Sequence, residues 1–107
     1  MIDESKVFYV EDIRFYIAED RLTIHQLNVS KKQWYKIAFI KHELQGDKYT
    51  LFVKENGFSM WCSKSYVNIE LLKLAMEEKL KIKEMPVEAD QHLQYLMGRS
   101  IMLKISS

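Results

Sequence analysis

Residues 49–83 read YTLFVKENGFSMWCSKSYVNIELLKLAMEEKLKIK and contain the two strongest secondary-structure patterns of the chain. Asn56-Gly57 separates two stretches rich in aromatic and β-branched residues, Tyr49 to Lys54 and Phe58 to Ser63. This dipeptide supplies the positive backbone angles of a tight type I′ turn. The sequence therefore predicts a β-hairpin, and a segment with helical spacing of apolar residues follows it.

That helix is expected to run from Asn68 to Lys83. Asn68 suits the N-cap position, where its side chain accepts a hydrogen bond from a free backbone amide, and Glu70 complements the positive end of the helix dipole. The segment carries two apolar rows: Ile69, Leu72, Met76 and Leu80, and then Leu71, Leu74, Ala75 and Ile82. This arc is wider than the one, somewhat over about 100°, of an ordinary surface helix. We therefore expect this arc to pack against a second element besides the sheet, either the next helix or another chain.

Upstream of the hairpin, the sequence predicts three further strands. Val7 to Val10 and Ile13 to Ile17 are rich in aromatic and β-branched residues, with a break near Glu11-Asp12. Arg21 to Val29 alternates apolar and polar residues, which is typical of a half-buried strand. A polar loop should follow it.

The segment from Trp34 to Leu44 fits two structures. A helix is supported by a capping box formed by Ser30 and Gln33 and by Gly46 at the position of a C-terminal cap. A strand is supported by the aromatic and β-branched run WYKIAFI, which would pair with the hairpin across a turn near Gly46. Both remain open, and we favour the strand.

Downstream of residue 83, the pattern predicts a second, shorter helix and a final strand. Pro86 suits the first helical position, helical spacing continues to Met97, and Gly98 can end the helix. The apolar run from Ile101 to Ile105 is expected to form an added strand or a partner contact. The fold class predicted for residues 1–107 is a single α+β domain, an antiparallel sheet of four or five strands with two helices in the C-terminal half.

Composition narrows the possible functions. With 48% hydrophobic and 29% charged residues, the chain is too apolar for intrinsic disorder. Cys62 is the single cysteine, which excludes an intramolecular disulfide and fits a reducing, cytoplasmic location. The longest apolar runs are far shorter than the roughly 20 residues of a membrane span, so no membrane partner is expected.

Catalytic and metal-binding motifs do not stand out in the sequence. His25, His42 and His92 lack paired metal-ligand spacing and fall on different predicted elements. Cys62 lies in an apolar strand, where a buried inert thiol is more common than a nucleophile. The three glycines are too far apart to form a phosphate loop. We therefore expect no enzyme activity, metal or cofactor.

The first functional hypothesis is a non-enzymatic protein-interaction module, acting as an adaptor, an inhibitor or an oligomerising domain. The wide apolar arc of the helix at 68–83 and the apolar run near the C-terminus suggest surface that an isolated monomer would bury with difficulty. Simple packing of the helix between the sheet and the next helix is the competing explanation. The residues expected to bind a protein partner or a second copy are Ile69, Leu72, Met76, Leu80, Ile101 and Leu103.

The alternative hypothesis is single-stranded nucleic-acid binding. The net charge is only +1, but the segment 31–64 interleaves lysines with aromatic residues. Single-strand binders combine a basic surface with aromatic rings on which bases stack. The competing explanation places the aromatic residues in the core and the lysines on the wet strand faces. The residues assigned to nucleic-acid binding are Lys31, Lys32, Trp34, Lys36, Lys41 and Trp61.

Overall fold

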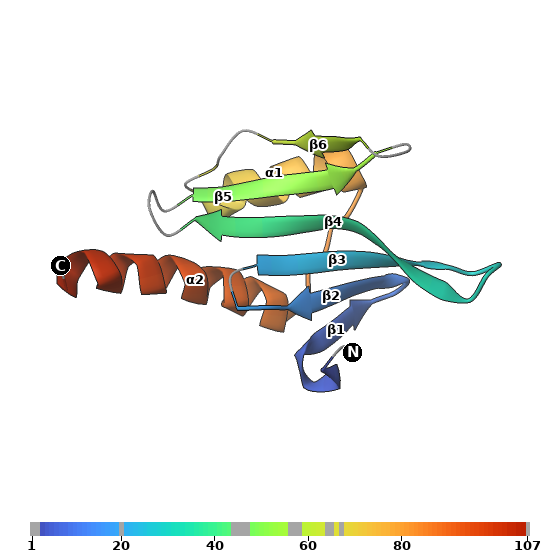
Figure 1. The fold of residues 1–107 in the computed structure, drawn as a ribbon, viewed down its shortest axis with the longest axis horizontal. Coiled ribbons are helices and arrows are strands. Elements are labelled where there is room, and N and C mark those ends of the chain that lie inside the picture. Colours follow the sequence, from blue (N-terminus) through green and yellow to red (C-terminus); the bar gives the residue numbers. More distant parts are fainter. Residues whose placement is uncertain are drawn as a thin grey trace.

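The computed structural model describes residues 3–19, 21–43, 48–55, 59–63, 66 and 68–106, the side chains of residues 43 and 97–106 excepted. This part of the chain forms one antiparallel sheet in which each strand lies beside its sequence neighbours, followed by two α-helices (Figure 1). The strands are β1 (Val7–Val10), β2 (Ile13–Ile17), β3 (Arg21–Asn28), β4 (Gln33–Glu43), β5 (Lys48–Lys54) and β6 (Met60–Cys62). The helices are α1 (Ile69–Leu80) and α2 (Val87–Ser106), and a short 3-10 helix, η1 (Glu4–Lys6), precedes β1.

The predicted α+β class is confirmed, with six strands in the sheet where four or five were expected. The hairpin of β5 and β6 is confirmed by its antiparallel pairing, in which Val53 lies opposite Trp61. Its turn at Asn56-Gly57 and the turn near Gly46 lie outside the described residues.

The ambiguous segment is a strand, as we favoured. β4 pairs with β3 on one side and with β5 on the other, so that Ile40 lies between Leu22 and Leu51. A helix would offer one apolar stripe, whereas the strand buries alternate residues in the middle of a sheet. The register between β3 and β4 shifts by an irregularity between Ile24 and His25.

The hydrophobic core lies between one face of the sheet and both helices. Its strand residues are Phe15, Leu22, Ile24, Ala38, Ile40, Tyr49, Leu51 and Val53, and its helix residues are Leu72, Met76, Ala89 and Leu93. Tyr49 is fully buried, and its hydroxyl donates a hydrogen bond to the backbone carbonyl of Leu93. This bond ties β5 to α2 across the core.

α1 begins as predicted and ends earlier. The Oδ1 of Asn68 accepts a hydrogen bond from the Glu70 amide at 2.7 Å, which is the expected N-cap. The helix stops at Leu80 because Lys81 adopts a left-handed conformation, φ 62°, and its amide donates to the Glu77 carbonyl. The prediction that the helix extends to residue 83 is therefore wrong, and Ile82 lies in the connection to α2.

α2 is longer than predicted. It continues through Gly98 to Ser106, so the expected helix end at Gly98 and the strand from Ile101 to Ile105 are both wrong. A glycine inside a helix costs only about 1 kcal/mol relative to alanine, and the residues after it include good helix formers. The last turns of α2 extend past the strands (Figure 1). Over the described residues, neither helix is both long and apolar enough to span a bilayer.

Candidate functional site

The face of the sheet remote from both helices is the candidate site, and we call it the open face. Successive strand residues point to opposite faces, so the register assigns each position to one of them. One row across the open face runs from Tyr9 through Arg14 and His25 to Lys36, and the next contains Tyr16, Thr23, Phe39, Phe52 and Cys62. The opposite positions, such as Phe15 and Ile40, form the core.

Among the described strand residues, positive charge is confined to the open face. Every lysine and arginine at a described strand position belongs to it: Arg14, Arg21, Lys36, Lys41, Lys48 and Lys54. Among the same positions Glu43 is the one acidic residue, and it lies opposite Lys48 in the register. A surface of one sign raises the local concentration of anions and their rate of association. The chain is almost neutral as a whole, so this distribution matters more than the net charge.

A first aromatic cluster lies at the end of the open face next to the turn between β3 and β4. The ring centroids of Tyr9 and Trp34 are 5.7 Å apart, and the Arg14 guanidinium lies 4.9 Å from the Trp34 ring centroid. Tyr9 is 51% exposed and Trp34 is half-buried. The cluster therefore presents aromatic surface and a cation to the solvent together.

A second cluster lies further along β4 and β5. The Phe39 and Phe52 rings are stacked, with centroids 4.6 Å apart and an interplanar angle of 14°. The Lys36 ammonium lies 4.8 Å and the Arg21 guanidinium 5.2 Å from the Phe39 centroid. Beside the rings is a hollow of about 330 Å³, lined by Lys36, Ala38, Phe39, Phe52, Lys54, Ser59 and Met60.

His25 lies between the two clusters, with Arg14 and Lys36 on either side of it in the register. Its burial first, and then the charges of Arg14 and Lys36, lower the pKa of His25 below the ordinary value of 6.5. Its Nδ1 is buried without a hydrogen-bond partner in the described structure, as is the Nε of Arg14. An anion placed here would favour protonated His25, which the bare face disfavours.

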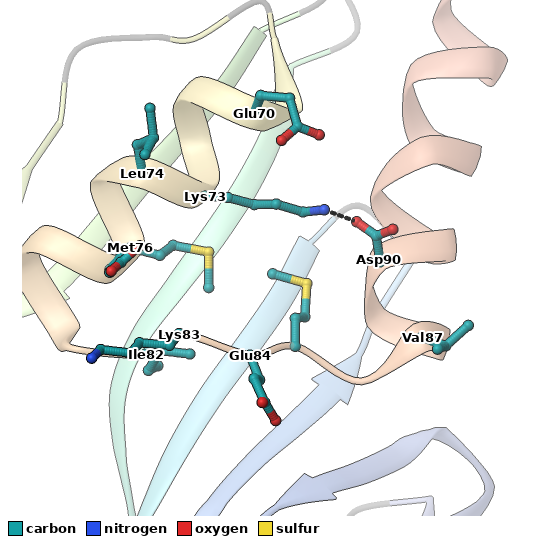
Figure 2. A pocket seen from close by; sticks show the side chains of 11 residues that line it. Glu70, Lys73, Leu74, Met76, Ile82, Lys83, Glu84, Val87 and Asp90 are labelled. Atoms are coloured by element: carbon teal, nitrogen blue, oxygen red, sulfur yellow. Dashed lines mark ion pairs between the residues drawn. The ribbon is translucent and has the colours of Figure 1, made fainter.

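A second hollow, of about 440 Å³, lies between α1, α2 and the segment that joins them (Figure 2). Lys73 reaches across it from α1, and its Nζ lies 2.7 Å from Oδ1 of Asp90 on α2. Its lining includes Glu70, Glu77 and Glu84 together with Met76, whose side chain belongs to the core. Its charges are mixed, and its ion pair joins the two helices, so we assign it to packing.

The residues predicted to bind a protein partner on α1 lie mainly in the core. Leu72 and Met76 are 0% and 1% exposed, and Ile69 and Leu80 are half-buried against the same cluster. This row therefore stabilises the fold. The exposed apolar residues of α1 belong to the second row: Leu71 is 49% and Leu74 is 60% exposed. Ile101 and Leu103 lie in α2, and their side chains are outside the described residues.

The residues predicted to bind nucleic acid are divided among three places. Trp34, Lys36 and Lys41 come together on the open face. Lys31 and Lys32 are exposed in the turn between β3 and β4. Trp61 belongs to the helix-covered face, where the Lys79 ammonium lies 4.6 Å from its ring centroid.

Sequence reasoning missed the contribution of the first two strands. Arg14 and Tyr16 alternate with Ile13, Phe15 and Ile17, so a half-buried strand with an outward arginine and tyrosine could have been recognised. Nothing in the sequence showed that these residues would lie beside Trp34, because the order and register of strands are properties of the folded sheet.

Among the described residues, no group of three or more histidine, cysteine or carboxylate side chains is arranged to hold a metal ion. Comparison with protein families, with curated proteins and with solved structures gives no match to this chain. Function must therefore be argued from the geometry of the open face.

Proposed function

We propose that the chain is a non-enzymatic binding domain whose open face binds single-stranded nucleic acid. One observation carries the proposal: the strand cations share with Trp34, Phe39 and Phe52 the one sheet face that neither helix covers. If these aromatic residues served only the core, they would be expected on the helix-covered face. They are instead surrounded by cations and partly open to solvent.

The chemistry of the ligand follows from this combination. Lysine and arginine bind phosphates and release counterions, while aromatic rings stack on unpaired bases of any sequence. Paired bases are not available for such stacking, which favours a single strand over a duplex. An anionic lipid surface would satisfy the cations, but half-buried rings lying along a sheet do not insert well into a bilayer. The experiment must therefore distinguish binding to anionic vesicles from binding to an oligonucleotide.

The test is the binding of a fluorescently labelled oligothymidylate, followed by anisotropy at low and moderate salt. The wild-type protein should bind, and the variant K36E/K41E should lose most of its affinity because two cations of the open face become anions. The control K6E/K83E makes the same change in net charge away from the sheet strands and should bind nearly as well as the wild type. Equal loss in both variants, or binding to anionic vesicles with none to the oligonucleotide, would refute the proposal.

Self-association is a second candidate, favoured by the length of α2. Its backbone runs past the sheet, and the sequence there includes Ile101, Met102, Leu103 and Ile105 (Figure 1). A second copy of the chain pairing with this helix would bury these residues. Sedimentation equilibrium should then give a dimer for the wild type and a monomer for I101K/L103K. A wild-type monomer at high protein concentration would rule this out.

A further inference from the structure

We infer that the hollow beside Phe39 and Phe52 is a subsite for one unpaired nucleobase, with the adjoining phosphates held by Lys36 and Lys54. The inference rests on the proposed function and deepens it. It assigns base stacking to a defined place on the open face and gives the cations beside that place a separate role.

The lining of the hollow matches the parts of a nucleotide. Phe39 and Phe52 contribute aromatic surface, and Met60, which is 50% exposed, adds a polarisable apolar side chain. Thioether sulfur makes favourable contacts with aromatic rings. Lys36 and Lys54 come from neighbouring strands, so both cations border the same apolar surface. A base can therefore enter the apolar part while its phosphates remain near the ammonium groups.

Charge distinguishes this hollow from the one between the helices. None of its described lining residues is acidic, whereas the hollow between the helices is lined by Glu70, Glu77, Glu84 and Asp90. The two hollows are of comparable size, about 330 and 440 Å³. An anionic ligand would thus be favoured at the first and opposed at the second.

The position of Lys36 suggests that its contact with the Phe39 ring is replaced by a contact with phosphate when a nucleotide binds. In the free protein its ammonium lies 4.8 Å from the Phe39 ring centroid, in a cation–π contact that is weak at an exposed site. A phosphate offers the same ammonium a stronger, charge-assisted hydrogen bond. Moving Lys36 to a phosphate exposes the ring to the base, so the two contacts should form together.

The experiment compares an oligothymidylate with an abasic oligomer of the same length and charge. In the wild type, removal of the bases should weaken binding roughly 5- to 150-fold for each stacked base. The variant Phe52→Leu keeps an apolar side chain but lacks the ring, so it should reduce this ratio. The control Tyr35→Leu removes a 41% exposed tyrosine from the opposite side of β4 and should leave the ratio unchanged.

The outcomes separate the inference from the proposed function. Failure of the wild type to bind either oligomer refutes both. Binding with an unchanged ratio in Phe52→Leu refutes only the subsite and leaves the stacking to other rings, such as Trp34. If Phe52→Leu does not fold, as judged by circular dichroism, NOEs measured on the wild-type protein bound to the oligothymidylate decide whether the subsite exists. NOEs from the thymine methyl group to Phe52 or Met60 are expected, and NOEs to Trp34 alone would overturn the inference.

Discussion

The same substitution made in each apolar row of α1, Leu72→Ala and Leu74→Ala, tests which row is buried. Leu72 is completely buried against the sheet, whereas Leu74, two residues further along the helix, is 60% exposed. A buried Leu→Ala change removes the transfer free energy of the lost atoms and leaves a cavity, at a cost of about 3–5 kcal/mol. A surface substitution is usually within about 0.5 kcal/mol.

The difference is large compared with the stability of a domain of this size. Total free energies of unfolding are roughly 5–15 kcal/mol, so Leu72→Ala should remove about a fifth or more of the stability. With about 4–8 °C per kcal/mol, the midpoint of thermal unfolding should fall by roughly 12–40 °C. Leu74→Ala should shift it by no more than a few degrees.

Urea unfolding followed by far-ultraviolet circular dichroism measures both free energies under the same conditions. The denaturation midpoint should fall sharply for Leu72→Ala with an unchanged slope, and it should hardly move for Leu74→Ala. Equal losses in the two variants would show that the second apolar row is also covered in solution. That result would contradict the assignment of Leu74 to the surface, and it would favour a partner on α1.

Three further outcomes are expected. Tyr49→Phe removes the buried hydrogen bond to the Leu93 carbonyl and should lower the free energy of unfolding by about 1–3 kcal/mol, measured in urea; no change would mean that this bond contributes nothing. For nucleic-acid binding, Lys41→Gln should reduce the slope of log affinity against log salt concentration by about 0.7, the value for one phosphate contact of a single strand, and an unchanged slope would exclude Lys41 from the interface. The lowered pKa of His25 means that the unfolded chain binds the proton first as the pH falls, so the free energy of unfolding should decrease as pH drops below 6.5. His25→Gln should lessen that decrease in urea titrations at neutral and mildly acidic pH, and an identical pH dependence in both proteins would count against the environment described for this histidine.

Local signals predicted the elements whose causes are local. Asn68 accepts its hydrogen bond within α1, so the N-cap could be recognised from three consecutive residues. The segment from Trp34 to Leu44 was ambiguous because the decisive partners of the strand it contributes to, β3 and β5, lie elsewhere in the chain. The run from Ile101 to Ile105 was apolar enough for a strand, but its backbone continued the helix that had begun at Val87.

In the candidate site, too, only the features with local causes could be predicted from the sequence. Interleaved lysines and aromatic residues could be seen in the sequence, and Trp34, Lys36 and Lys41 were selected from them. The face on which each would lie depends on pairing, which placed Trp61 against α1 and brought Arg14 beside Trp34. The contribution of β1 and β2 to the site therefore could not be predicted from local sequence patterns.

The irregularity between Ile24 and His25 has a consequence for the continuity of the open face. Strict alternation along β4 would place Trp34 and Lys36 on the same side as Ala38 and Ile40, under the helices. The shift in register moves them to the side of Phe39 and Lys41. Ile37 is the extra residue in this irregularity, and if it were paired as an ordinary strand residue, the indole and its neighbouring lysine would point into the core and the continuous surface would be divided into two. The aromatic and cationic surface thus depends on the β-bulge that accommodates Ile37 as much as on its side chains.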